Sequence, residues 1–260
     1  MNLDDPVAPG EQICLEEAPL GHLARPHARQ VRAGLTERWG GESDGPFGTL
    51  NLGRSTADPT ARVLANEQRV LRHLGLPDRV ARLRLEHGTR ILEPAEPGLH
   101  GMADALLSDQ DDLTLWLTVA DCYPVAITLG RWRTLGHCGW RGVAGGLPIQ
   151  MLAALAAASG CDAALARAWI GPGIGACCYE VGPEVSAAFP LSALRPGTGD
   201  RSQLDLRAEI RRQLESAGLP SAAVAASSSC TACEAGRFFS HRRDGVPAGR
   251  MAALCWVEPG

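Results

Sequence analysis

LTLWLTVADCYPVAITLGRWRTLGHCGWRGVAGGLPIQMLAALAAASG, residues 113–160, is the stretch that decides the fold. Its first half holds three β-rich runs, at 113–120, 125–129 and 133–137, with Pro124 and Gly130 between them, which predicts neighbouring strands. After Gly142 the pattern changes to an apolar, alanine-rich run that ends at Gly160, which predicts a largely buried helix. The middle of the chain is therefore predicted to be a sheet that a helix covers.

The flanking segments add two amphipathic helices and two further strands. Asp58-Pro59 offers an N-cap followed by proline at the first helical position, and the apolar positions after it run to Gly75. A second helix is expected over 206–217 with Asp205 as its N-cap, and strands are expected at 83–86 and 251–257. Residues 1–28 are rich in Pro, Glu and Gly and are predicted to be a loosely ordered lead-in to a domain over 29–260. Strands with helices between and around them indicate an α+β or layered α/β fold in one domain.

Composition excludes several classes of function. The net charge is -4, which provides no general attraction for nucleic acid or for anionic membranes. All 25 basic residues are Arg, so neither a Schiff-base lysine nor a P-loop lysine is available. The acidic N-terminus, the absence of a long apolar run and nine scattered cysteines predict a cytoplasmic protein with reduced thiols.

Three residues of metal-ligand type, His87, Cys122 and His137, follow or end predicted strands. Zinc accepts imidazole nitrogen and thiolate sulfur, and three protein ligands leave a fourth position for water or substrate. Their spacings of 35 and 15 residues match no short zinc-binding motif, so a structural cysteine and ordinary core histidines remain the alternative. A second alternative uses Cys122 as a nucleophile and His137 as its base, as in a thiol hydrolase.

Several motifs in collinear order carry a family resemblance that extends from about residue 36 to 257. They are Gly45–Gly53, Glu86–Thr89, Thr118–Val125, His137–Gly142, Gly171–Gly175, Tyr179–Gly182, Cys230-Thr231, Phe238–Asp244 and Gly249–Ala252. In these motifs the chain resembles the laccase-domain family, formerly labelled multicopper polyphenol oxidase.

The resemblance implies packed mixed β-sheets flanked by helices, in α/β/β/α layers. It also implies that His87, Cys122 and His137 hold zinc and act in catalysis, with purine nucleoside and inorganic phosphate as substrates. The implied activity is phosphorolysis of adenosine, inosine and S-methyl-5′-thioadenosine, with adenosine deamination beside it. Such an enzyme must position phosphate and the departing purine. The motif positions suggest four substrate-binding residues, Arg38, Asn51, Arg141 and Arg242.

The chain departs from the family motifs at Leu85-Glu86 before the first ligand, at Cys138 after the third, and at His241 in place of a tyrosine. These changes leave the three ligand residues in place, but they put the substrate preference in question. The former family name suggests an alternative hypothesis, a copper oxidase. Seven histidines without His-x-His pairs are too few for a blue copper site and a trinuclear one. A non-enzymatic binder, or a factor that edits cell-wall (peptidoglycan) precursors, is a further alternative that the resemblance brings.

Four cysteines outside this set are predicted to be structural residues. Cys230 and Cys233 form one Cys-x-x-Cys, which without a second pair does not predict a zinc ribbon or a redox site. Cys177 and Cys178 are adjacent and are predicted to be small buried residues near a glycine-rich turn.

Overall fold

Two six-stranded β-sheets pack face to face at the centre of the computed structural model, which describes residues 12–22 and 29–259. In sheet order the first contains β1 (Leu15–His22), β2 (Gln30–Thr36), β15 (Met251–Val257), β7 (Thr114–Val119), β3 (Val80–Arg84) and β5 (Gly98–Met102). The second contains β14 (Val224–Ala226), β10 (Arg167–Ile170), β8 (Tyr123–Leu129), β9 (Trp132–Cys138), β6 (Ala105–Ser108) and β4 (Ile91–Leu92). A small third sheet contains β11 (Glu180–Val181), β13 (Ser202–Leu204) and β12 (Leu194–Pro196).

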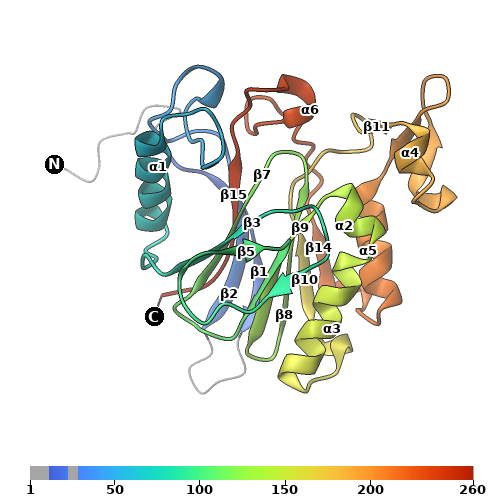
Figure 1. Ribbon diagram of the computed structural model, residues 1–260. Coiled ribbons are helices and arrows are strands. Elements are labelled where there is room, and N and C mark those ends of the chain that lie inside the picture. The colour runs from blue at the N-terminus through green and yellow to red at the C-terminus, as the bar shows by residue number, and fades with distance from the viewer. Residues whose placement is uncertain (1–11, 23–28, 260) are drawn as a thin grey trace.

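The outer faces of the two large sheets are covered by the helices α1 (Thr60–His73), α2 (Trp140–Ala144), α3 (Leu147–Ser159) and α5 (Leu206–Ser216) (Figure 1). In contrast, α4 (Pro183–Ser186) contacts the small third sheet, and a further helix is α6 (His241–Asp244). Figure 1 shows α1 on one side of the sheets and α2, α3 and α5 on the other. The layers are therefore α/β/β/α, and the predicted α+β fold class is confirmed.

Three apolar clusters join these layers. Val70 and Leu71 of α1 pack with Trp116 and Leu254 of the first sheet. Between the sheets, buried side chains such as Leu35, Leu115, Leu135 and Phe239 fill the space. Met151, Leu155, Ile210 and Val125 belong to the cluster between the second sheet and its helices. β8 is buried at every position because the sheet is covered on both faces, so its sequence is a continuous apolar run.

The predicted helices are confirmed, with one difference at a cap. Asp205 accepts a hydrogen bond from the N–H of Ala208 and caps α5, and Gly160 takes the left-handed conformation that ends α3. Asp58 does not cap α1, because its carboxylate accepts hydrogen bonds from Ser43 and Asn51 instead.

The expectation of a loosely ordered segment is wrong for residues 15–22, which form β1 and pair with β2 in antiparallel register. Within positions 15–21 of this strand only Ala18 and Leu20 are buried, and Pro19 lies between them at an exposed position. Proline is tolerated because β1 is an edge strand. The alternation of apolar and polar residues over 15–22 is therefore too weak to predict a strand from the sequence. The rest of segment 1–28 lies largely outside the described residues.

Strand ends position the candidate site. β3 and β7 run parallel, so their C-terminal ends meet at the same edge of the first sheet. His87 follows β3 by three residues and Cys122 follows β7 by three, while His137 is the penultimate residue of β9. β8 begins at Tyr123 and includes Pro124, which the sequence analysis had placed between strands.

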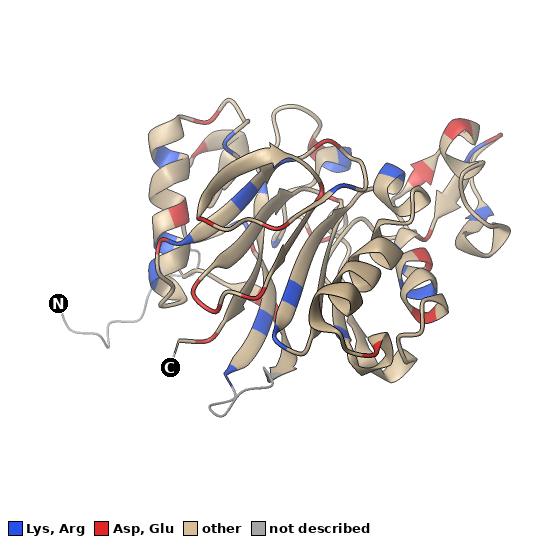
Figure 2. Ribbon diagram, turned by 60° about the horizontal axis from the view of Figure 1, so that its bottom comes forward, with Lys and Arg blue, Asp and Glu red and all other residues tan. Residues whose placement is uncertain are grey.

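Two observations concern surface character. Within the described part of the chain, no helix is long and apolar enough to span a membrane. In the view of Figure 2 basic and acidic residues are interspersed over the ribbon, consistent with the small net charge of -4.

Candidate metal centre and active site

His87, Cys122 and His137 come together in the structure, although they are separated by 35 and 15 residues along the chain. Their ligand atoms all lie within 4.8 Å of one another. The two imidazole rings meet edge to face, with centroids 4.9 Å apart and an interplanar angle of 88°. Cys122 is half-buried, His137 is buried and His87 is exposed, so the group is open on one side.

The backbone at two of these positions is held in an uncommon conformation. His87 has φ 61° and Asp121, directly before Cys122, has φ 86°; among the described non-glycine residues no others have positive φ. Such conformations are costly for residues with a Cβ and persist where the surroundings fix them. Asp121 is fixed at both carboxylate oxygens, which accept hydrogen bonds from the Thr231 hydroxyl at 2.6 Å and from the Arg242 N–H at 2.7 Å. This network aims Cys122 at the two histidines.

Asp104 supports the site from behind. Its buried carboxylate accepts hydrogen bonds from the backbone N–H groups of His87 at 3.0 Å and Gly88 at 2.6 Å. It also lies 2.9 Å from Nδ1 of His137, which leaves Nε2 of that ring for a cation. A carboxylate behind a histidine ligand is the usual means of fixing ring orientation in metal sites.

A glycine keeps open the space between the three side chains. A Cβ on Gly139 would lie 3.2 Å from Sγ of Cys122, 3.6 Å from Cδ2 of His87 and 3.7 Å from Cε1 of His137. Two nitrogens, one sulfur and a cradle that any larger residue would fill suit a zinc-type cation with three protein ligands. The residues present therefore fit a metal, although they do not decide which one.

The pKa values of the two histidines are shifted in opposite directions. Partial desolvation lowers the pKa of His87, and the nearby His137 and Arg141 lower it further. Burial lowers the pKa of His137 too, but Cys122 and the Asp104 carboxylate outweigh it and raise that pKa to about 10. Burial alone would raise the pKa of Asp104, yet the hydrogen bonds from His137 and Gly88 bring it below its ordinary value. In the metal-free protein these shifts favour the imidazolium form of His137 and the neutral form of His87.

The three side chains line a cavity of about 700 Å³. The apolar lining includes Leu52, Leu83, Leu85, Leu99, Trp116 and Val119, and the polar lining includes Arg54, Arg82, Arg84, His241 and Arg250. Glu67 pairs with Arg54 at 2.5 Å and with Arg82 at 3.0 Å, so one carboxylate is shared by two guanidinium groups. A cavity of this volume, largely apolar with a few convergent polar groups, is typical of a small-molecule site.

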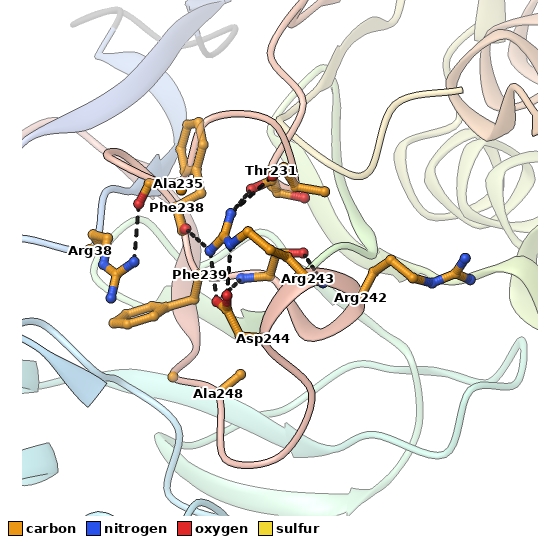
Figure 3. Close-up of polar contacts among 12 residues, drawn as sticks. Arg38, Thr231, Ala235, Phe238, Phe239, Arg242, Arg243, Asp244 and Ala248 are labelled. Atoms are coloured by element: carbon orange, nitrogen blue, oxygen red, sulfur yellow. Dashed lines mark hydrogen bonds and ion pairs between the residues drawn. The ribbon is translucent and has the colours of Figure 1, made fainter. Parts of the chain in front are cut away.

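Two of the predicted substrate residues are engaged within the protein. Arg38 donates to the carbonyls of Gly48 and Ala235, and its guanidinium lies 4.6 Å from the Phe239 ring centroid (Figure 3). Asn51 is fully buried and its side-chain carbonyl accepts a hydrogen bond from the N–H of Arg250 at 2.9 Å. Neither residue lines the cavity.

Arg141 and Arg242 are not among the residues that line this cavity. The Arg141 guanidinium packs 4.3 Å from the Trp140 ring and that of Arg242 lies 5.1 Å from the Tyr179 ring. Figure 3 shows the Arg242 side chain extending away from the Arg243–Asp244 pair. Among the ion pairs of the described residues, none involves Arg141, Arg242 or Arg250.

Sequence reasoning missed three residues of this region: Asp104, Tyr179 and Arg250. Burial raises the pKa of Tyr179 to about 12, with Cys122 and Asp121 among its charged neighbours, which places the phenol beside the site. Arg250 lines the cavity within electrostatic reach of Asp121 and Cys122. Tyr179 and Arg250 stand in motifs that carried the resemblance. A carboxylate between apolar residues at 103–107 was the available signal for Asp104.

The prediction that Cys177 and Cys178 are buried is wrong. Cys177 is exposed, Cys178 is half-buried, and both approach Cys230 and Cys233 to within 4.8 Å. The sequence held both pairs, but it gave no indication that chain segments 52 residues apart bring them together.

Comparison with known proteins defines the family. Residues 32–258 match the family model described as multi-copper polyphenol oxidoreductase laccase. The chain therefore belongs to this laccase-domain family. Among the curated relatives, the purine nucleoside phosphorylase YlmD of Geobacillus stearothermophilus is 34% identical over 89% of this chain and 91% of its own. The purine nucleoside phosphorylase YfiH of Escherichia coli is 32% identical over 89% of this chain and 96% of its own.

Solved structures agree with this assignment. The crystal structure of YlmD from Geobacillus stearothermophilus superposes with a TM-score of 0.84 at 31% identity, over 93% of this chain and 100% of that one. The hypothetical protein YfiH of Bacillus licheniformis gives a TM-score of 0.84 at 32% identity, over 87% and 92% of the two chains.

Proposed function

We propose that this protein is a zinc-dependent purine nucleoside phosphorylase that acts on adenosine, inosine and S-methyl-5′-thioadenosine. One observation carries the proposal: a two-histidine, one-cysteine group backed by Asp104 opens into a cavity of about 700 Å³ that also presents Arg250. The names of the relatives at 34% and 32% identity support the same reaction. The donor set favours zinc over copper, because it lacks the additional histidines of a blue or trinuclear copper site.

In phosphorolysis, an oxygen of inorganic phosphate forms a bond to C1′ of the ribose while the bond from C1′ to the purine nitrogen breaks. The purine leaves with the electron pair of that bond and takes up a proton. The protein must hold the phosphate dianion close to C1′ and keep the sugar and base oriented. His87, Cys122 and His137 would hold the zinc ion, which would supply Lewis acidity for this reaction.

Arg250, Arg141 and Arg242 are the candidates for holding phosphate. A guanidinium forms paired hydrogen bonds with phosphate oxygens, and an arginine with no acidic partner keeps its charge available for that purpose. Asn51 is proposed to act through Arg250, since its side-chain carbonyl fixes the backbone of that residue. The apolar lining residues Leu52, Leu83 and Leu85 suit the face of a purine.

We also propose adenosine deaminase activity, in which water replaces the exocyclic amine at C6 and releases ammonia. A metal-activated water is the usual reagent for that step. His241 lines the same cavity where the family motif has tyrosine, so it is proposed to tune the preference between substrates.

The proposed activities are separated by one assay. Zinc-loaded protein is incubated with adenosine, with and without phosphate, and adenine, ribose 1-phosphate and inosine are followed by chromatography. Phosphate-dependent adenine supports phosphorolysis, whereas inosine that forms without phosphate supports deamination. Absence of both from the zinc-loaded protein contradicts the proposal, and Cys122→Ala is the control that removes one ligand.

A second candidate function rests on a specific contact. The ligand atoms of Cys122 and His137 lie within 4.8 Å of each other, and Asp104 contacts Nδ1 of His137 at 2.9 Å. A thiol, an imidazole and a carboxylate in this order form the arrangement of a cysteine hydrolase. Such an enzyme retains activity in the presence of a metal chelator and loses it on alkylation of Cys122. A zinc enzyme loses its activity to the chelator and regains it with added zinc.

A further inference from the structure

We propose that Cys177, Cys178, Cys230 and Cys233 form a second metal site that binds one thiophilic divalent cation, zinc above all, and joins two loops beside the active site. This site shares no residue with the group of His87, Cys122 and His137, and it does not depend on the proposed enzymatic activity. We refer to it as the four-cysteine site.

The geometry of the sulfur atoms suits a single ion. All four Sγ atoms lie within 4.8 Å of one another. Cys233 Sγ is 3.5 Å from that of Cys177 and 3.3 Å from that of Cys178. Four sulfurs around zinc at about 2.3 Å stand about 3.8 Å apart in a tetrahedron. A disulfide would need two sulfurs at about 2.05 Å and would leave the other pair unused.

Both chain segments are shaped to present these sulfurs. Cys177 and Cys178 lie in a tight turn in which the N–H groups of Cys178 and Tyr179 donate to the carbonyl of Gly175, at 2.9 and 3.0 Å. Such a turn lets two adjacent side chains point to the same side. Cys230 and Cys233 lie in a second turn, closed by the N–H of Glu234 donating to the carbonyl of Cys230 at 3.0 Å.

A backbone N–H group is directed at one of the sulfurs, which is an independent sign of a thiolate site. Gly175 donates to Sγ of Cys230 at 3.1 Å. Such a donor stabilises the thiolate, which is the form that binds a metal. A Cβ on Gly175 would stand 3.1 Å from Sγ of Cys177 and 3.3 Å from that of Cys230, so glycine leaves these sulfurs room.

The site is placed to fix the loops that carry active-site residues. The two loops already meet through a parallel bridge between Gly173 and Cys230, and Thr231 is the donor that holds Asp121. Tyr179 directly follows Cys178. Figure 3 shows Arg243 holding the second loop by donating to the carbonyls of Thr231 and Ala232. An ion bound to all four sulfurs would tie these contacts into one unit, and the thiol protons that it displaces would go to solvent.

Metal stoichiometry is the first test. Protein purified in reductant with excess zinc removed is analysed by inductively coupled plasma mass spectrometry. With one ion for each four-coordinate site, the wild type is expected to hold about two zinc ions per chain. The Cys122→Ser variant and the double variant Cys177→Ser/Cys233→Ser should each hold about one. The matched control Cys14→Ser/Cys161→Ser changes two exposed cysteines elsewhere and should hold about two.

Cobalt spectroscopy tests the ligands without disturbing the site. Cobalt-loaded Cys122→Ser protein keeps the four-cysteine site intact and is expected to show the strong sulfur-to-cobalt charge-transfer absorption of a tetrathiolate. Adding Cys233→Ser to this variant should weaken that absorption. Zinc should also raise the melting temperature of Cys122→Ser protein, because a ligand that binds only the folded state stabilises it.

Three results would overturn the proposal. One is a wild type that holds a single zinc ion, which Cys122→Ser removes. Another is cobalt-loaded Cys122→Ser protein without charge-transfer absorption. The third is a disulfide between two of the four cysteines in freshly reduced, zinc-loaded protein, which would make the cluster a redox pair instead.

Discussion

Asp104 shows how one buried carboxylate organises the candidate metal centre. It accepts hydrogen bonds from two backbone N–H groups and contacts Nδ1 of His137, so it fixes both the loop that carries His87 and the ring of His137. The Asp104→Asn variant keeps the shape but loses the charge. Losing such a partner typically lowers metal affinity by about 10–100-fold.

The measurement for Asp104→Asn is a competition titration with a zinc-binding dye. Asp112→Asn is the matched control, since Asp112 is an exposed carboxylate that pairs with Arg79. An unchanged affinity in Asp104→Asn would show that the carboxylate has no part in metal binding.

The two histidines give a prediction on pH. In metal-free protein the pKa of His137 is raised to about 10 and that of His87 is lowered from its ordinary value. Two-dimensional NMR of the imidazole nitrogens should find His137 protonated at neutral pH and His87 neutral. Since the folded pKa of His137 exceeds the unfolded one, its protonation stabilises the metal-free fold fully below about 6.5. That contribution is lost as pH rises through about 10. A His137 ring that titrates near 6.5 would contradict this account of the site.

Replacing Arg250 should weaken phosphate binding and leave metal binding unchanged. It lines the cavity and forms no ion pair with a described residue. Arg250→Met keeps much of the stem and removes the charge-assisted hydrogen bonds, each worth about 1.5–3 kcal/mol, so the KM for phosphate should rise about 10–100-fold.

Zinc content of Arg250→Met should stay at the wild-type value, because Arg250 is not a ligand. Arg131→Met, at a surface arginine paired with Asp109, is the control. A phosphate KM equal to that of the wild type would remove Arg250 from the phosphate site.

At the scale of elements, α2 is held close to the loop after β3 by the lack of a side chain. A Cβ on Gly142 would stand 2.8 Å from the carbonyl oxygen of Gly88, closer than real Cβ contacts allow. Gly142→Ala should push α2 away from His87, at a cost of about 1–3 kcal/mol as for other overpacked sites.

Thermal unfolding and zinc content together test the Gly142→Ala prediction. A lower melting temperature combined with weaker zinc retention is expected. Ala144→Ser changes an exposed residue of the same helix and should alter neither quantity. If Gly142→Ala lowered stability but kept full zinc affinity, the packing of α2 would not position the ligands.

At the scale of the whole molecule, the sequence was informative wherever local patterns decide structure. The strands of 113–138 and the helices α1, α3 and α5 follow from apolar periodicity and end signals, and they are found where predicted. The edge strand β1 was not predicted, because only two side chains within positions 15–21 are buried and a proline lies between them.

The ligand residues of the candidate site could be predicted from the sequence, but the residues that surround them could not. His87, Cys122 and His137 stand at strand ends, which the sequence shows, and a family resemblance joins them. Asp104 reaches His137 only because β6 pairs with β9, and Cys177 reaches Cys233 only because two distant loops meet. Such pairings depend on tertiary structure, so single-sequence patterns could not supply them.

The central claim is that this chain transfers the ribosyl group of a purine nucleoside to phosphate. Its most direct test is phosphorus NMR of zinc-loaded protein with adenosine and inorganic phosphate. We expect the phosphate signal to decline as a ribose 1-phosphate signal grows in step with free adenine, and we expect neither change with Cys122→Ala. Adenine released with free ribose, or an unchanged phosphate signal beside intact adenosine, would contradict the account.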